Sequence, residues 1–161
     1  MKKAAFLSAV ISVISLGALS ALWAAGAPAQ SSAPSLYSRL GGFDAIAALI
    51  DDFGPRLGTD PKLARFFGGH GKDSQLRQRQ LAIEYICEKT GGPCLYIGRS
   101  LKNTHAGLGI TESDWDMAMK HLQLSLDKSK IQSKERAELL ALVGSFKKDV
   151  VDAPAPAPAT K

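Results

Sequence analysis

Apolar residues recur at helical spacing through most of the chain from residue 35 to residue 151. The first series returns every three or four positions, which places it on one face of a helix: Phe43, Ile46, Ile50, Phe53 and Leu57. Gly54-Pro55 interrupts this series. Because proline removes a backbone N–H and crowds the preceding turn, we expect the helix to end or kink there.

The middle of the chain predicts two further helices. Asp60-Pro61 combines a capping residue with a favoured first position, so we expect a short helix through Phe67, followed by a glycine-rich loop over 68–71. Ser74 can cap a longer helix that runs to Thr90 and stops at Gly91-Gly92-Pro93. Its expected inward side chains are Leu76, Ile83, Ile86 and Cys87.

The last third of the chain continues the helical pattern. A short helix is expected from Leu101 to Ala106, and Thr111 and Asp114 have the spacing of a capping box for the next helix. That helix should bury Trp115, Ala118, Leu122 and Leu126. A final helix from Ser133 should bury Ala137, Leu140, Val143 and Phe146 or Val150. Alternating strand patterns are absent, so the sequence predicts an all-α fold.

The two ends of the chain have different compositions from the middle. Residues 1–29 combine Lys2 and Lys3 with an uncharged apolar stretch and a small-x-small site, as in an export signal. The stretch is also long enough for an uncleaved N-terminal anchor. Either alternative places the remainder outside the cytoplasm. We expect a linker over 30–34, a folded domain over 35–151, and a disordered Ala/Pro tail over 152–161.

Composition narrows the class of protein. The chain has 161 residues, 45% of them hydrophobic and 22% charged, which suits one globular domain. Its formal charge of +5 falls to +3 if the first 29 residues are removed. That charge, without a basic stripe, argues against nucleic-acid binding. A small enzyme, a cofactor- or ligand-binding module and an exported structural protein remain.

Histidine and cysteine are the candidates for chemistry. Of the three histidines, His105 shares a helical face with Leu101 and Leu108, as a proximal haem ligand would, although a core histidine fits that spacing too. His121 is expected to be solvated and His70 to lie on the surface. In an exported protein Cys87 and Cys94 can be oxidised, with a redox pair as the alternative. Covalent haem attachment through Cys-x-x-Cys-His and a zinc cluster both lack their motifs.

The order of several short motifs is specific. The chain carries, in sequence, Leu40-Gly41-Gly42, Asp60-Pro61, Phe66-Phe67, Thr90-Gly91-Gly92-Pro93, Tyr96-x-Gly98-Arg99 and His105-Ala106-Gly107-Leu108-Gly109-Ile110-Thr111. This pattern resembles the group I truncated haemoglobins, a two-over-two helical sandwich around haem b. It also resembles an exported subset of that family with a Cys-x6-Cys pair, which implies a disulfide between Cys87 and Cys94.

The resemblance implies a set of haem neighbours around iron held by His105. On the proximal side these are Leu101, Thr104, Leu108, Ile110, Trp115 and Ala118. Phe66 and Phe67 are expected at the haem edge, where a large apolar macrocycle needs aromatic cover. Arg99 and Lys102 are the expected partners of the propionates. The distal wall is expected to comprise Gln78, Leu81, Ala82 and Tyr85, with Gln80 replacing Gln78 in an alternative register.

The distal side departs from the family. The position that usually carries a ligand-binding tyrosine falls at Gly54, which supplies no hydroxyl. Tyr85, Gln78 or Gln80 is the expected replacement donor, and tight oxygen binding is in question.

The resulting hypothesis is an exported haem b protein that reversibly binds oxygen, nitric oxide or carbon monoxide. A haem enzyme, either a nitric oxide dioxygenase served by an unidentified reductase or a peroxidase, is the alternative. A helical interaction module without haem is the third hypothesis. Retention of haem by the purified protein separates the third from the other two.

Overall fold

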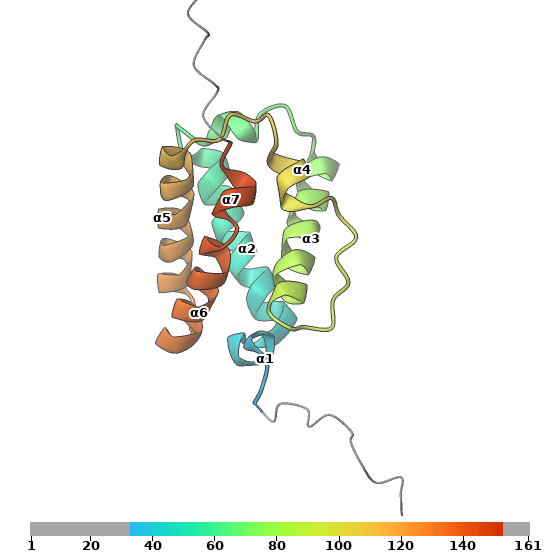
Figure 1. The fold of residues 1–161 in the computed structure, drawn as a ribbon, viewed down its shortest axis with the longest axis vertical. Helices are drawn as coiled ribbons and strands as arrows, with labels where there is room; N and C mark the ends of the chain where they lie inside the picture. Colours follow the sequence, from blue (N-terminus) through green and yellow to red (C-terminus); the bar gives the residue numbers. More distant parts are fainter. Residues whose placement is uncertain (1–32, 153–161) are drawn as a thin grey trace, which may run out of the picture. The chain divides into compact units, whose positions relative to one another are not determined.

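The computed structural model describes residues 33–152, and every regular element in that range is helical (Figure 1). The elements are α1 (Leu36–Leu40), α2 (Gly42–Thr59), the 3-10 turn η1 (Ala64–Phe66), α3 (Lys72–Lys89), α4 (Leu101–His105), α5 (Glu112–Lys128), α6 (Ser133–Gly144) and α7 (Lys147–Val150). This confirms the predicted all-α class. The predicted signal or anchor over 1–29, most of the linker over 30–34 and the Ala/Pro tail beyond 152 lie outside the described residues.

Helix α2 is the centre of the packing, because it contacts both α3 and α5. Between α2 and α3 the buried side chains are Ile46, Ile83 and Cys87. A second cluster, of leucines, joins α1, α2, α5 and α6: Leu40, Leu49, Leu122, Leu126 and Leu139. The two clusters use neighbouring positions of α2, because Ile46 and Leu49 are three residues apart on one side of the helix. The partly buried Ile86 packs against both clusters, so they form adjoining parts of the core.

The predicted end of the first main helix at Gly54-Pro55 is wrong. Helix α2 continues through Pro55 to Thr59. Proline removes one N–H late in the helix, yet the last turn closes through other bonds. The Thr59 hydroxyl donates to the Pro55 carbonyl (2.8 Å), and the Asp60 N–H donates to the Arg56 carbonyl (3.2 Å). Packing of α2 on α3 and α5 then outweighs the cost of the missing bond.

The capping predictions have mixed outcomes. The box at the start of α5 is confirmed: the Thr111 hydroxyl accepts from the Asp114 N–H, and the Asp114 side chain accepts from the Thr111 N–H. Ser74 does not begin α3, which starts at Lys72 after Gly71. Asp60 does cap, since its carboxylate accepts the N–H of Lys62 at 2.8 Å and of Leu63 at 3.2 Å, but only a 3-10 turn follows, not an α-helix.

Three expected core residues are exposed instead. Leu76 is 54% exposed, Phe43 is 38% exposed, and Ala137 also faces solvent. Leu76 and Phe43 lie in the first two turns of their helices, before the helix reaches the core. In α6 the buried position is Leu139, which the prediction passed over.

No helix within residues 33–152 is long and apolar enough to cross a membrane.

Candidate functional site

His105 is the last residue of α4, and its ring orientation is set within that helix. Ser100 caps α4 by accepting the Asn103 N–H at 3.3 Å. The Nδ1 atom of His105 lies 2.8 Å from the Leu101 carbonyl oxygen. A carbonyl only accepts, so Nδ1 carries the proton and the lone pair of neutral imidazole is on Nε2. The partly buried ring therefore offers one nitrogen as a ligand, oriented from behind by the backbone.

The chain just after His105 is clamped by Asp152. The Asp152 carboxylate accepts the N–H of Gly107 at 3.3 Å and of Gly109 at 2.6 Å, and the Asp152 N–H donates to the Ile110 carbonyl at 3.0 Å. Gly107 and Gly109 both have positive φ (78° and 67°), a backbone shape that favours glycine. This clamp joins the residues following the histidine to the end of α7.

A second network fixes the start of α5. Asp114 is only 6% exposed, and its carboxylate accepts from the Thr111 hydroxyl (2.7 Å), the Thr111 N–H (2.9 Å) and the Arg65 guanidinium (2.7 Å). Burial raises the pKa of Asp114, but these hydrogen bonds outweigh burial and bring its pKa below the ordinary value. The same guanidinium lies 4.2 Å from the centre of the Phe66 ring. Arg65 thus links Phe66, which is predicted at the haem edge, to Asp114 at the start of α5.

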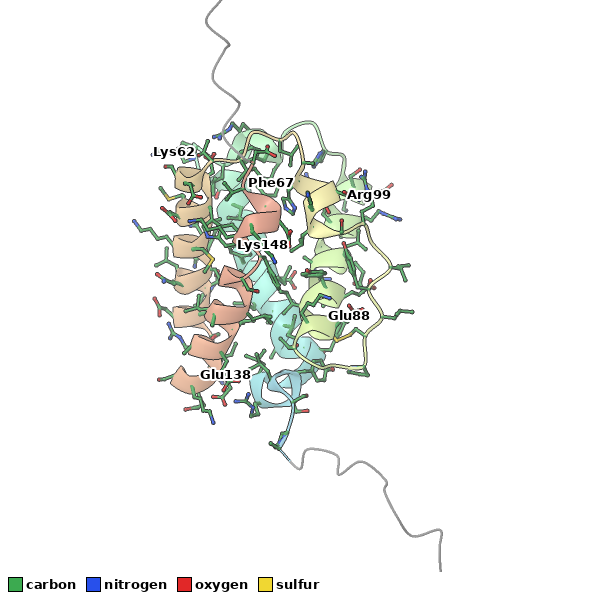
Figure 2. All side chains as sticks on the ribbon, viewed as in Figure 1. Lys62, Phe67, Glu88, Arg99, Glu138 and Lys148 are labelled. Atoms are coloured by element: carbon green, nitrogen blue, oxygen red, sulfur yellow. A yellow bond between two sulfur atoms is a disulfide. The ribbon has the colours of Figure 1, made fainter. Side chains whose placement is uncertain are left out.

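The other residues predicted around the haem differ in burial. Ile110 and Trp115 are buried, Leu101 and Ala118 are partly buried, and Phe66 and Phe67 are partly buried near η1. Leu108 is 48% exposed, and Thr104, Lys102 and Arg99 lie at the surface, Arg99 at the outer margin of the domain (Figure 2). The two predicted cations are thus accessible, as partners of solvent-facing carboxylates would be.

An open depression of about 440 Å³ adjoins α4. Three residues predicted near the haem line it together, namely Tyr85, Leu101 and Lys102. Lys89, Tyr96, Ser100 and Asp149 add further polar groups to the lining. The structure thus brings part of the predicted distal wall on α3 and part of the predicted proximal side on α4 to one concave surface.

The two glutamines predicted as distal donors face other partners. The Gln78 amide lies 3.1 Å from His70 Nδ1, and the Gln80 amide donates to Glu84 at 2.9 Å. Both glutamines are exposed, and His70 lies on the surface as predicted. In this arrangement neither side chain is committed to a ligand between α3 and α4.

Tyr85 is held by aromatic contacts, while Leu81 and Ala82 beside it are partly buried. The Tyr85 ring packs edge-on against Tyr96 (centroids 4.9 Å apart) and Phe146 (5.3 Å). Burial raises the pKa of the Tyr85 phenol, while nearby Lys89 acts in the opposite direction. Its hydroxyl has no hydrogen-bond partner within residues 33–152, which leaves it free to donate.

Gly54 leaves open space on α2. A Cβ built at Gly54 would meet no atom within 4 Å of the described residues. Gly54 is partly buried. At the position where the resemblance implies a tyrosine, this chain therefore has no side chain and no hydroxyl.

His121 differs from the prediction of a solvated side chain. Its Nε2 lies 2.8 Å from an Asp60 carboxylate oxygen, and its Nδ1 is buried without a partner in the described part of the chain. The hydrogen bond from His121 lowers the pKa of Asp60. The pair ties the end of α2 to α5, a contact between residues 61 positions apart that helical spacing cannot reveal.

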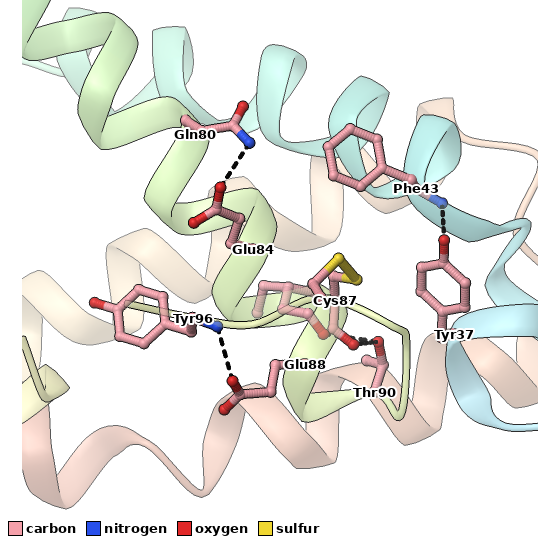
Figure 3. Close-up of a disulfide and its surroundings, with 10 residues drawn as sticks. Tyr37, Phe43, Gln80, Glu84, Cys87, Glu88, Thr90 and Tyr96 are labelled. Atoms are coloured by element: carbon pink, nitrogen blue, oxygen red, sulfur yellow. Dashed lines mark hydrogen bonds between the residues drawn. A yellow bond between two sulfur atoms is a disulfide. The ribbon is translucent and has the colours of Figure 1, made fainter. Parts of the chain in front are cut away.

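Cys87 and Cys94 form a disulfide, with Cα atoms 5.8 Å apart (Figure 3). The bond joins the buried end of α3 to the segment that leads to α4. Near it the Tyr96 N–H donates to the Glu88 carboxylate at 2.8 Å. The path from α3 to His105 is therefore fixed at two points.

Comparison with known proteins matches this architecture. A family model described as bacterial-like globin matches residues 35–152, so the chain belongs to the bacterial-like globin family. The group 1 truncated hemoglobin GlbN of Nostoc commune is 34% identical over 88 residues, which cover 55% of this chain and 72% of that protein. Its named relatives are thus group 1 truncated hemoglobins.

Solved structures agree on the fold. THB1 of Chlamydomonas reinhardtii has a TM-score of 0.62 at 31% identity, covering 73% of this chain and 98% of that one. The 2/2 hemoglobin of Synechococcus sp. PCC 7002, with covalently attached heme, has a TM-score of 0.66 at 25% identity and the same coverage. The predicted truncated globin, a two-over-two helical sandwich, is confirmed.

The residues present fit a haem. Haem iron needs one protein nitrogen on its proximal side. In His105 the Nδ1–H group donates to the Leu101 carbonyl, which leaves the lone pair of Nε2 available for that bond. No group of three or more His, Cys, Asp or Glu side chains within residues 33–152 could hold a bare metal ion.

Proposed function

We propose that the protein binds haem b through Nε2 of His105 and reversibly binds a diatomic gas, oxygen first, with nitric oxide and carbon monoxide as ligands of the same chemistry. The observation that carries the proposal is the 2.8 Å contact between His105 Nδ1 and the Leu101 carbonyl in a chain of the globin family. When bound, haem supplies an iron coordination position for such a gas.

The protein's own residues have separable roles in this proposal. Leu101 holds the imidazole in the ligating tautomer, and Asp152 fixes the backbone beyond it. Trp115, Ile110 and Phe66 supply apolar cover, while Arg99 and Lys102 receive the propionates. On the distal side Gly54 offers space in place of a donor, so gas binding depends on Tyr85 alone or on no donor.

The disulfide supports the b-type assignment and export. Both cysteines of the chain are joined to each other, so neither thiol is free to form a thioether with a vinyl group. Disulfides persist in oxidising compartments, which supports a location outside the cytoplasm, reached by the predicted signal or anchor over 1–29. An oxidising compartment also calls for an unidentified reductase to keep the iron reduced.

Haem titration of the purified protein tests the proposal. We expect stoichiometric uptake by the parent protein, with absorption bands that shift when the reduced protein is exposed to oxygen or carbon monoxide. His105→Ala should abolish stable retention, because the protein bond to iron is lost. His70→Ala is the matched control, since that histidine lies on the surface. Equal retention by the two variants would overturn the assignment.

A further inference from the structure

The segment between α3 and α4 has one packed face and one solvent face. Burial alternates strictly from Pro93 to Arg99, as in a strand whose successive side chains point to opposite sides. The partly buried positions are Cys94, Tyr96 and Gly98, and the exposed ones are Pro93, Leu95, Ile97 and Arg99. In Figure 1 this segment runs along the margin of the domain, outside α3.

The packed face holds the segment firmly. Cys94 is bonded to Cys87, the Tyr96 N–H donates to Glu88, and the Tyr96 ring packs on Tyr85. The Tyr96 hydroxyl also donates to the Arg99 carbonyl at 2.7 Å. The opposite face is therefore presented in a fixed form and cannot turn inward to bury its apolar side chains.

That opposite face is apolar. Leu95 is 76% exposed and Ile97 is 79% exposed, more than any other large hydrophobic side chain in residues 33–152. The two are neighbours on one side of the extended segment, so they form a single patch, which we call the Leu95–Ile97 patch. It is too small for a stable protein interface, which buries about 800 Å² from each partner.

Charges around the patch favour an anionic surface. Arg99 continues the exposed row, and Lys89 and Lys102 line the depression that Tyr96 shares. The carboxylates facing the same region are Glu88, bonded to the Tyr96 N–H and to Lys89, and Asp149 in the depression. Three cations against two carboxylates leave a small positive excess, of the kind that adds to apolar insertion at an anionic lipid surface.

The start of the domain lies next to this segment. The Tyr37 N–H donates to the Thr90 carbonyl at 2.8 Å, so α1 begins beside the turn from which the segment leaves α3. In the sequence, the uncharged apolar stretch over 4–25 precedes α1 by a short connection. The nine residues over 26–34 reach at most about 32 Å. A membrane that held the stretch over 4–25 would thus be within reach of the patch.

We infer that the Leu95–Ile97 patch docks the domain onto an anionic membrane surface, with both side chains inserted at the lipid interface. Docking sets the depression beside α4 close to the lipid. The stretch over 4–25, kept as an uncleaved anchor, would tether the domain to the membrane. This tether compensates for the small area of the patch, because it raises the effective concentration of the membrane at the patch.

Hydrogen exchange of the full chain on vesicles tests this inference without reference to haem or gas. The vesicles contain phosphatidylcholine with phosphatidylglycerol, and the readout is the exchange rate of amides in peptides covering 93–99. We expect these amides to slow about tenfold relative to vesicle-free protein, the factor that corresponds to 1.4 kcal/mol. Phosphatidylcholine alone, or added salt, should reduce the slowing because the charge contribution is lost or screened.

Matched variants separate the patch from the tether. Leu95→Asp with Ile97→Asp should abolish the slowing, while Leu124→Asp, at a 41% exposed leucine on α5, should retain it. Unchanged exchange in peptides of α5 and α6 confirms folding, and Leu95→Ser with Ile97→Ser serves if the acidic pair unfolds the domain. No slowing in the parent protein, or slowing that survives in both patch variants, overturns the inference. Slowing without vesicles that rises with protein concentration also overturns it, since a second copy then covers the patch.

Discussion

The segment from Leu101 to Trp115 and the first half of α3 both carry residues predicted to surround the site, yet they hold those residues differently. On the His105 side, carbonyl and carboxylate acceptors bind the backbone and the imidazole: Leu101, Asp152 and Asp114. On the α3 side, Gln78 and Gln80 bond to surface neighbours. If the proposed function holds, this difference means that the residues anchoring the cofactor are preorganised, whereas those facing the gas are held only loosely.

The largest effect is expected from removing Asp114. Asp114→Ala loses the capping box and the bond to Arg65, and should lower the free energy of unfolding by about 2–3 kcal/mol. Asp44→Ala, in the exposed first turn of α2 and without a capping bond, should cost about 0.5 kcal/mol or less. Urea unfolding followed by circular dichroism measures both. Equal losses in the two variants would show that the bonds of Asp114 do not stabilise the His105 side more than an ordinary exposed aspartate does.

Acid should act on the same two sides unequally. The pKa values of Asp114 and Asp51 both lie below the ordinary value in the folded protein, so each contributes stability that is present above about pH 4 and is lost as the pH falls through the folded pKa. The loss is expected to be smaller than in Asp114→Ala, because a protonated carboxyl still accepts a bond. Asp51 pairs with Arg79 at an exposed site, where an ion pair contributes little.

Urea midpoints at successive pH values, compared between the parent protein and the two asparagine variants, measure this difference. Asp114→Asn should flatten the acid dependence more than Asp51→Asn does. A greater flattening in Asp51→Asn would show that the α2–α3 side carries the pH-sensitive stability.

The clamp at Asp152 should show a moderate effect on haem retention. In Asp152→Ala the N–H groups of Gly107 and Gly109 lose their acceptor, and we expect haem loss to an acceptor globin to be roughly tenfold faster. Asp152→Asn retains one acceptor oxygen, so its rate of haem loss should lie between those of the parent protein and Asp152→Ala. Asp73→Ala, in the exposed first turn of α3, is the control and should be unchanged. Haem loss from Asp152→Ala at the parent rate would mean that His105 needs no support from α7.

The smallest effect is expected on the distal side. A tyrosine hydroxyl that bonded the gas would slow its release by roughly tenfold, to a hundredfold for a strongly polar ligand, and Gly54 supplies none. We therefore expect fast oxygen release from the reduced parent protein. Tyr85→Phe, alone or with Gln78→Ala and Gln80→Ala, should change the rate by less than about twofold, since a neutral bond contributes about 1 kcal/mol only where it is made. Stopped-flow measurement of the oxygen release rate in the parent protein and in each variant tests this expectation. Slow release that becomes tenfold faster in Tyr85→Phe would identify Tyr85 as the donor.

Local features of this fold could be predicted from the sequence, and long-range ones could not. The all-α class and the Thr111 capping box depend on neighbours within a turn, which explains why they were predicted correctly. Which positions of a helix are buried depends on distant partners, and the burial of Phe43, Leu76 and Ala137 was predicted wrongly. The predicted helix end at Pro55 was wrong because α3 and α5, which are distant in sequence, pack against α2 and stabilise it.

The site divides in the same way. His105 was predicted as the iron ligand because it lies in a local motif, and this remains a prediction. The clamp on the residues after it comes from Asp152, 43 residues beyond Gly109, which the sequence did not reveal. Arg65 reaches Asp114 across 49 residues. An aspartate at the end of the last helix and an arginine in a short turn carry no signal of their own, because either residue is common at such exposed positions.

Ion pairs join α1, the first helix, to α6 near the other end of the domain. Arg39 on α1 bonds to Glu135 (2.8 Å) and to Glu138 of α6, partners 96 and 99 residues further along the chain. During synthesis, which proceeds from the N-terminus, α1 thus waits for nearly the whole domain to emerge before its ion pairs can form. Closing so long a loop is entropically costly and slow. A chain that leaves the ribosome in this order exposes Arg39 without its two carboxylate partners until α6 has emerged.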